Sequence, residues 1–286
     1  MAETGQSRSV MQPVPPPAKP AKARDVDMPF LDHLEELRWR IIKGLGGVLI
    51  GVVLALVFSE WVMDVLLLGP TRKDFFMYGL LGIDSIDIIL QSRRLPGQFF
   101  TYWGTMLMIG AIAGSPIFFY QMWAFIEPAL GDDHIRHTRF VAFFISLLFM
   151  MGVSFGYLIL TPFALQFFMQ FTISDFVRND FDINEYFNSL TMWILASGII
   201  FQLPMVSWAL SRIGLLTPEF MIKYRRHSIV IILVVAAIIT PPDPLSQIMI
   251  AIPLVILYQI SIYISRLANR KRNKEIWGTA KPPASD

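Results

Sequence analysis

Residues 228–264 read SIVIILVVAAIITPPDPLSQIMIAIPLVILYQISIYI, two apolar runs joined by a turn that contains three prolines. A proline cannot donate a backbone hydrogen bond, so TPPDP (240–244) ends the first helix and the second begins after it. As a helix, the run 228–239 measures about 18 Å, whereas the hydrocarbon core of a bilayer is about 30 Å thick. Arg226 and Arg266 bracket the pair. We therefore expect a helical hairpin that enters and leaves a membrane on the same side, with its turn in a locally thinned bilayer.

The rest of the chain places this hairpin in a membrane protein. Hydrophobic residues make up 54% of the sequence and charged residues 16%, whereas a soluble domain carries about 25% charged residues. Four further apolar runs are long enough to cross a bilayer as helices: about 41–59, 103–126, 140–168 and 190–210. The predicted fold is an all-α membrane protein with six transmembrane helices, of which the fifth and sixth are short. Prolines within the apolar runs are expected to kink these helices into a concave bundle; they are Pro116, Pro162, Pro204 and Pro253.

The distribution of positive charge predicts the orientation. Nineteen of the 24 lysine and arginine residues lie in the segments on one side of the expected spans, and cytoplasmic segments carry the excess of these residues. Both termini are therefore expected in the cytoplasm, with the protein in the cytoplasmic (inner) membrane. We predict a disordered polar tail over residues 1–28, a membrane domain over 29–266 and a basic tail over 267–286. The net charge of +2 is too small to indicate nucleic-acid binding.

Several functional classes are disfavoured by what the sequence lacks. It contains no cysteine, which excludes disulfides and thiolate metal sites. His134 and His137 stand beside two aspartates, but a solvated polar loop explains this pattern better than a metal site does. No catalytic triad, metalloprotease motif or glycine-rich phosphate loop is present, so we expect neither an enzyme nor a bound cofactor. The spans hold almost no ionisable residues, which argues against the main alternative, a small-solute secondary transporter.

A cluster of charges precedes the first span, in DHLEELRWR (32–40). We expect a helix with Asp32 as its N-cap and Glu35 as the capping-box partner, which leaves Glu36 without a structural role. Glu36 can form an (i, i+4) ion pair with Arg40, worth only about 0.2–1 kcal/mol at a surface. Alternatively, it presents an anionic spot to a cationic ligand at the membrane surface. The residues alone leave both interpretations open.

Four stretches, taken in order, resemble the TatC family, the polytopic core subunit of the twin-arginine protein translocase. They are HLEELRWR (33–40), SPIFFYQMWAFIEPAL (115–130), FQLP (201–204) and TPPDPLSQIMIAIPLVILYQISIYISR (240–266). The resemblance covers roughly residues 28–270. It implies a six-span protein that recognises the twin-arginine signal peptides of folded precursors. It also implies assembly with the single-span partners TatA and TatB, as a homo-oligomer within a larger complex surrounded by membrane lipids.

The resemblance also implies a signal-peptide site. Glu36, Arg38 and Phe125 match residues of the family's motifs, and a carboxylate at the inner surface suits the bidentate fork of a signal arginine, which lysine cannot copy. The family's second acidic position falls on His134 here, with Asp133 one residue earlier, so either residue is a candidate for the second contact.

Two further polar residues are singled out by the motifs. Gln202 is the deepest clear polar group of the spans and stands where the family often has glutamate. It either makes a hydrogen bond between helices of the bundle or forms a polar docking point for a partner helix. Asp243 matches the acid of the family's outer turn before the sixth helix.

Overall fold

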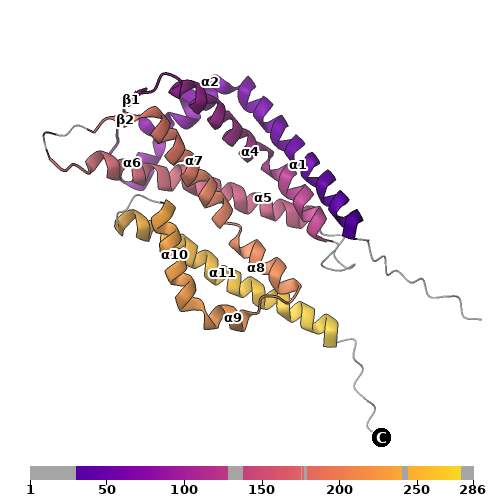
Figure 1. The fold of residues 1–286 in the computed structure, drawn as a ribbon. Coiled ribbons are helices and arrows are strands. Elements are labelled where there is room, and N and C mark those ends of the chain that lie inside the picture. Colours follow the sequence, from indigo (N-terminus) through magenta and orange to yellow (C-terminus); the bar gives the residue numbers. More distant parts are fainter. Residues whose placement is uncertain (1–29, 128–137, 175, 177–178, 240–243, 278–286) are drawn as a thin grey trace, which may run out of the picture.

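The computed structural model describes residues 30–127, 138–174, 176, 179–239 and 244–277, and their fold is almost entirely helical (Figure 1). The main helices are α1 (Phe30–Val57), α4 (Gly97–Ile126), α5 (Thr138–Phe155), α6 (Thr161–Gln170), α7 (Ile183–Ile200), α8 (Leu203–Arg212), α10 (Arg225–Ile239) and α11 (Pro244–Trp277). The shorter elements are α2 (Ser59–Trp61), α3 (Phe76–Leu81), α9 (Pro218–Lys223), two π-helical turns (Val62–Leu67 and Gly156–Leu160), a 3-10 turn (Gly69–Thr71), and the strands β1 (Leu90–Gln91) and β2 (Phe181–Asp182). The predicted all-α class is confirmed.

Five stretches of the described residues are helical, long and apolar enough to cross a membrane: Leu34–Val57, Gly97–Ile126, Arg139–Gln170, Ile183–Arg212 and Ile250–Arg270. They include the four long apolar runs of the sequence and the second run of the hairpin. α10 forms from the first run of the hairpin and has 15 residues. Its length of about 22 Å is below the thickness of a hydrocarbon core, as expected for a short fifth helix. A sixth crossing by α10 stays a prediction.

α11 corrects the expectation of a short sixth helix. It runs for 34 residues, from Pro244 to Trp277, and continues through Pro253. The segment after Ser265 consists largely of arginine, lysine, leucine, alanine and glutamate, which have high helix propensity. The helix therefore continues beyond the apolar run and into the basic segment that the sequence analysis assigned to a tail.

Prolines coincide with helix boundaries in two of the spans. Pro162 lies in the first turn of α6, after the π-helical turn that follows α5, and Pro204 lies in the first turn of α8. Proline is favoured there because the first N–H groups of a helix have no intrahelical acceptor. Pro116 and Pro253 lie inside α4 and α11, which are not interrupted. The spans that contain Pro162 and Pro204 are thus each built from two helical pieces, as these proline positions indicated.

α1 and α4 pack backbone against backbone. A side chain added at Gly51 would lie closer than 3.0 Å to the backbone of Gly110, and one added at Gly114 would clash in the same way with the backbone of Gly47 and its neighbour. The glycines follow a four-residue spacing on both helices, Gly47 to Gly51 and Gly110 to Gly114. This small-residue pattern permits close helix pairs in membranes, where van der Waals packing drives association.

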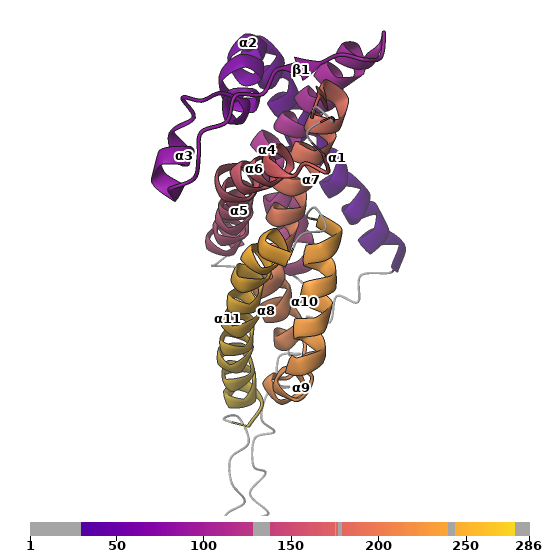
Figure 2. The same cartoon turned by 90° about the vertical axis from the view of Figure 1, so that its left-hand side faces the viewer.

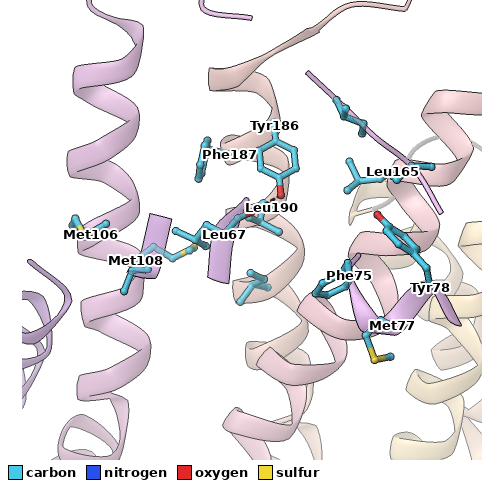
Figure 3. Close-up of a cluster of buried hydrophobic side chains, with 14 of the residues drawn as sticks. Leu67, Phe75, Met77, Tyr78, Met106, Met108, Leu165, Tyr186, Phe187 and Leu190 are labelled. Atoms are coloured by element: carbon cyan, nitrogen blue, oxygen red, sulfur yellow. Dashed lines mark hydrogen bonds between the residues drawn. The ribbon is translucent and has the colours of Figure 1, made fainter. Parts of the chain in front are cut away.

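Three buried or half-buried tyrosines hold the segment between α1 and α4. Tyr78 lies within this segment, whereas Tyr157 and Tyr186 join it to the bundle (Tyr78 and Tyr186 are labelled in Figure 3). Each hydroxyl donates a hydrogen bond to a backbone carbonyl oxygen: Tyr157 to Leu66, Tyr186 to Leu67, and Tyr78 to Pro70. The π-helical turn and the 3-10 turn end here and leave carbonyl groups without helical partners, and the tyrosines supply donors for them. Burial raises the pKa of the Tyr78 hydroxyl, which keeps it a donor.

A second link joins this segment to the loop before α7. β1 and β2 pair in parallel, with Leu90 opposite Phe181 and Gln91 opposite Asp182. The backbone N–H of Arg93 donates to Oδ2 of Asp182 at 3.1 Å. Asp182 also caps α7 by accepting from the backbone N–H of Asn184 at 2.8 Å. The hydrogen bond from the Asn184 side chain is the main reason that the pKa of Asp182 lies below its usual value.

The helix ends fall into two groups in space. The start of α1, the end of α4, the end of α8, α9 and the end of α11 lie towards the lower right of Figure 1, and we call this the inner end. β1, β2, the end of α6 and the end of α10 lie towards the left, and we call this the outer end. In the view of Figure 2, α8, α10 and α11 lie below α4 and α7, and α10 and α11 pack against Leu160, Ala164 and Trp193. The division into an inner and an outer end agrees with the alternation of membrane sides that the distribution of lysine and arginine predicts.

Candidate functional site

The candidate site begins on the first turns of α1, at the inner end. The helix starts at Phe30, so Asp32 is its third residue and the prediction of Asp32 as N-cap is wrong. The residue before Phe30 is a proline, a residue that is favoured where helices begin, and the helix therefore starts earlier than the capping pattern suggested. Further along the same turns, Glu35, Arg38 and Trp39 are exposed.

Glu36 forms the ion pair with Arg40 that the (i, i+4) spacing predicted. Nε and Nη2 of Arg40 donate to the same oxygen, Oε1 of Glu36, at 2.8 and 2.6 Å. Both side chains are 25% exposed. The second oxygen, Oε2, accepts no hydrogen bond from the described residues. A guanidinium can pair with a carboxylate through both oxygens, so the pair leaves Glu36 half of its accepting capacity.

The register of α1 on α4 places Glu36 near the level of Phe125. Gly44 faces Phe118 and Gly47 faces Ile117, and the glycine contacts further along continue the same antiparallel register. Glu36 lies eight residues before Gly44 on α1. Because the helices are antiparallel, eight residues after Phe118 on α4 is the matching level, and the turn there contains Phe125. The structure thus brings these two predicted residues to the same end of one helix pair.

Other predicted residues are not placed by the structure. Asp133, His134 and Asp243 lie outside the described residues. α4 ends just before the first two and α5 begins just after them, at Thr138. The described chain therefore reaches the inner end on both sides of this loop, and the second acidic contact stays a prediction.

Gln202 lies in the turn between α7 and α8, at the N-cap position of α8. Its side-chain Nε2 donates to the backbone oxygen of Ile145 on α5 at 3.1 Å. The hydrogen bond between helices of the bundle is therefore present. The side chain is only partly buried, and docking of a partner helix at this position stays a prediction.

Two features of the inner half were missed in the sequence. Serines at four-residue spacing on α8 and α11 are all buried; they are Ser207, Ser211, Ser261 and Ser265. The hydroxyl of Ser211 donates to that of Ser265 at 2.7 Å, which ties the two helices closely. The spacing of small residues was the available signal. Glu127 and Arg212, at the inner ends of α4 and α8, are also buried and have interaction partners; their position beside apolar runs gave no indication of burial.

Comparison with known proteins identifies the family. A family model described as Sec-independent protein translocase protein (TatC) matches residues 32–253. The chain belongs to the TatC family. It is 38% identical over 260 residues to the TatC protein of Blattabacterium sp. subsp. Periplaneta americana (strain BPLAN), covering 86% of this chain and 98% of that relative. It is 35% identical to TatC of Aquifex aeolicus (strain VF5), covering 87% of this chain and 99% of the relative.

A solved structure agrees with this assignment. The chain matches a crystal structure of the twin-arginine translocase receptor TatC with a TM-score of 0.67 and 35% sequence identity, covering 83% of this chain and all of that one. The resemblance based on four motifs is confirmed. The protein is a TatC-type subunit of a Sec-independent protein translocase and a helical membrane protein. TatC proteins are translocase components and not enzymes, and family membership replaces the alternative of a small-solute transporter.

Proposed function

We propose that this TatC protein binds the twin-arginine signal peptides of folded precursors, and that Glu36 receives one of the two arginines. The observation that carries the proposal is the geometry of the Glu36 carboxylate. It stands on the first turns of α1, near the level of Phe125, and only one of its oxygens is used by Arg40. A carboxylate in this state can accept a second guanidinium without losing its first partner.

The remaining contacts come from the neighbouring residues of the inner end. Arg38 is exposed on the same part of α1, and Phe125 offers an aromatic surface at the end of α4. Asp133 or His134 supplies the second contact. If the histidine is the one that acts, signal binding changes between pH 5 and 8, where imidazole titrates. If the aspartate acts, binding is constant over that range and is weakened by Asp133→Asn.

The proposal includes an orientation and partners. The inner end, with most of the lysine and arginine residues, faces the cytoplasm of the inner membrane, and both termini lie there. α10 and α11 together form the last two of six crossings, with Asp243 in an outer turn that reaches water through a thinned bilayer beside a concave face. TatA- and TatB-type subunits dock through their single helices, with Gln202 as one polar contact.

Photocrosslinking tests the signal-binding role. A twin-arginine signal peptide that carries a photoreactive group beside its arginines is incubated with membranes that contain the wild-type protein, the Glu36→Lys variant or the Glu35→Lys variant. Glu35 is an exposed neighbour, so its variant has the same charge change at an adjacent position. We expect crosslinking to disappear for Glu36→Lys and to persist for Glu35→Lys. Equal crosslinking of both variants refutes the role of Glu36.

A further inference from the structure

One glycine of α4 has no packing role. A side chain added at Gly104 would meet no atom within 4 Å, in contrast to the glycines that face α1. Glycine is less favourable than alanine inside a helix, and helix contact does not account for it at this position. Gly104 lines a cavity of about 480 Å³ between α4 and α7. The missing side chain leaves this cavity open.

The walls of the cavity carry polar groups without protein partners. At its outer edge, the side chain of Asn184 has protein partners, because it accepts from the hydroxyl of Thr101 at 2.8 Å and donates to Asp182 at 2.9 Å. One and two turns deeper, Asn188 and Thr191 also line the cavity, and their side chains make no hydrogen bond to any described residue. Both lie within a predicted membrane span. Polar groups in hydrocarbon are costly unless they find partners, so these two side chains call for a polar ligand.

The mouth of the cavity is positively charged and lies at the depth of lipid headgroups. Arg94 is the single charged residue among those that line it, and within the described part of the chain its guanidinium forms no ion pair. Phe99 and Trp103, on the adjoining turns of α4, are exposed, and aromatic rings of this kind mark the boundary between membrane and water. Gly104 follows Trp103 directly and lies about 10 Å along α4 from its first residue, Gly97, at the inner edge of this boundary.

We propose that this cavity binds one phospholipid of the outer-end leaflet. Its phosphate pairs with Arg94 at the mouth. Its ester carbonyl oxygens accept hydrogen bonds from Asn188 and Thr191, and an acyl chain runs over Gly104. A phospholipid fits better than a partner helix, because a helix offers no phosphate for Arg94 and has its own backbone acceptors already occupied.

The test uses native mass spectrometry of the full-length protein in detergent. The probes are dioleoyl-phosphatidylglycerol, dioleoylglycerol, which lacks the phosphate, and inorganic phosphate. The variants are Gly104→Leu, which fills the cavity from an open position, and Arg94→Gln, which changes an exposed side chain. Gly46→Leu is the matched control, because a side chain at Gly46 also meets nothing within 4 Å but lies on α1.

We expect the wild type and Gly46→Leu to retain one phosphatidylglycerol that Gly104→Leu does not retain. Arg94→Gln should bind it about tenfold more weakly, since a charge-assisted hydrogen bond is lost. Dioleoylglycerol should not be retained and inorganic phosphate should not compete. Undiminished lipid retention by Gly104→Leu, or equal binding of inorganic phosphate, overturns the proposal. Loss of a co-purifying single-span protein from Gly104→Leu, with lipid retention unchanged, also overturns it and assigns the cavity to a helix.

Discussion

The outer and inner ends of this TatC protein differ in how their residues are held. At the outer end, tyrosine hydroxyls bind the backbone of the segment between α1 and α4, and side chains such as Leu67 and Leu190 are fully buried (Figure 3). At the inner end, the start of α1 presents Arg38 and Trp39 to the surroundings. Glu36 there has one ion pair, with a residue of its own helix. The outer end is fixed by tertiary contacts, whereas the start of α1 at the inner end is left accessible.

This difference separates stability from binding. The glycine contacts between α1 and α4 set the position of Glu36 relative to Phe125 without using any side chain of the proposed site. Substitutions in the glycine contact or at the outer end should therefore lower the stability of the fold. Substitutions on the accessible first turns of α1 should change signal binding and leave the stability almost unchanged.

Gly51→Leu should have the largest effect on stability. The new side chain would overlap the backbone of Gly110, which has no side chain that can move away. Overpacking of this kind costs about 1–3 kcal/mol or more, so we expect a markedly lower unfolding temperature in detergent. Gly46→Leu, on the same helix but facing open space, should unfold like the wild type. Equal unfolding temperatures for the two variants would mean that α1 and α4 do not pack closely.

Tyr186→Phe should have the next largest effect and should be confined to stability. It removes the hydroxyl that donates to the backbone oxygen of Leu67 at 2.6 Å and leaves that buried oxygen unpaired. The expected cost is about 1–3 kcal/mol, measured by thermal unfolding. Tyr120→Phe, at a partly exposed position on α4, is the control and should have little effect. Loss of signal binding by Tyr186→Phe at a temperature where the protein is folded would break the separation between the two ends.

Arg40→Gln should have a smaller effect, and its sign is informative. The Glu36–Arg40 pair is partly exposed, and such pairs contribute about 0.2–1 kcal/mol. Without Arg40, both oxygens of Glu36 are available to the signal arginine, so binding should strengthen by up to about fivefold. The measurement is the dissociation constant of a twin-arginine peptide. A weakening would show that Arg40 positions the carboxylate and does not compete for it.

Asp182→Asn should have the smallest effect, at the outer end. The carboxylate caps α7 and accepts from Arg93 and Asn184, and these contacts hold its pKa below the usual value. A lowered pKa contributes stability that is present at neutral pH and is lost as the pH falls below the ordinary carboxyl range. The unfolding temperatures of wild type and variant should therefore differ slightly at pH 7 and converge in acid, below the ordinary carboxyl range. A difference that persists in acid would assign the effect to another cause.

The main elements of the fold were predictable because they depend on local properties. Apolar length gave the four long spans and the short α10, and the proline positions gave the breaks at Pro162 and Pro204. The hydrogen bonds from tyrosines to the π-helical turn depend on residues far apart in the chain, such as Leu67 and Tyr186, and no local pattern indicates them. The continuation of α11 was missed because apolar length was taken to define the helix, although propensity favours helix beyond it.

The candidate site was predictable only in part. The spacing of Glu36 and Arg40 on one helix gave their ion pair directly. The relation of Glu36 to Phe125 depends on the register between α1 and α4, which is set by the glycine contacts. The glycine spacing was visible in the sequence, but its pairing partner was not. Gly104 shows the limit of such patterns, since its spacing does not reveal that it faces a cavity.

The central claim, that Glu36 receives a signal arginine, is tested most directly by the preference for arginine over lysine. The dissociation constants of a twin-arginine peptide and of the same peptide with two lysines are measured for the wild type, Glu36→Gln and Glu35→Gln. We predict that the wild type and Glu35→Gln prefer the arginine peptide by about tenfold, because the rigid guanidinium fork can direct two N–H groups at the free oxygen Oε2, as Arg40 does at Oε1. Glu36→Gln should bind both peptides weakly and about equally. An undiminished preference for arginine in Glu36→Gln would contradict the account.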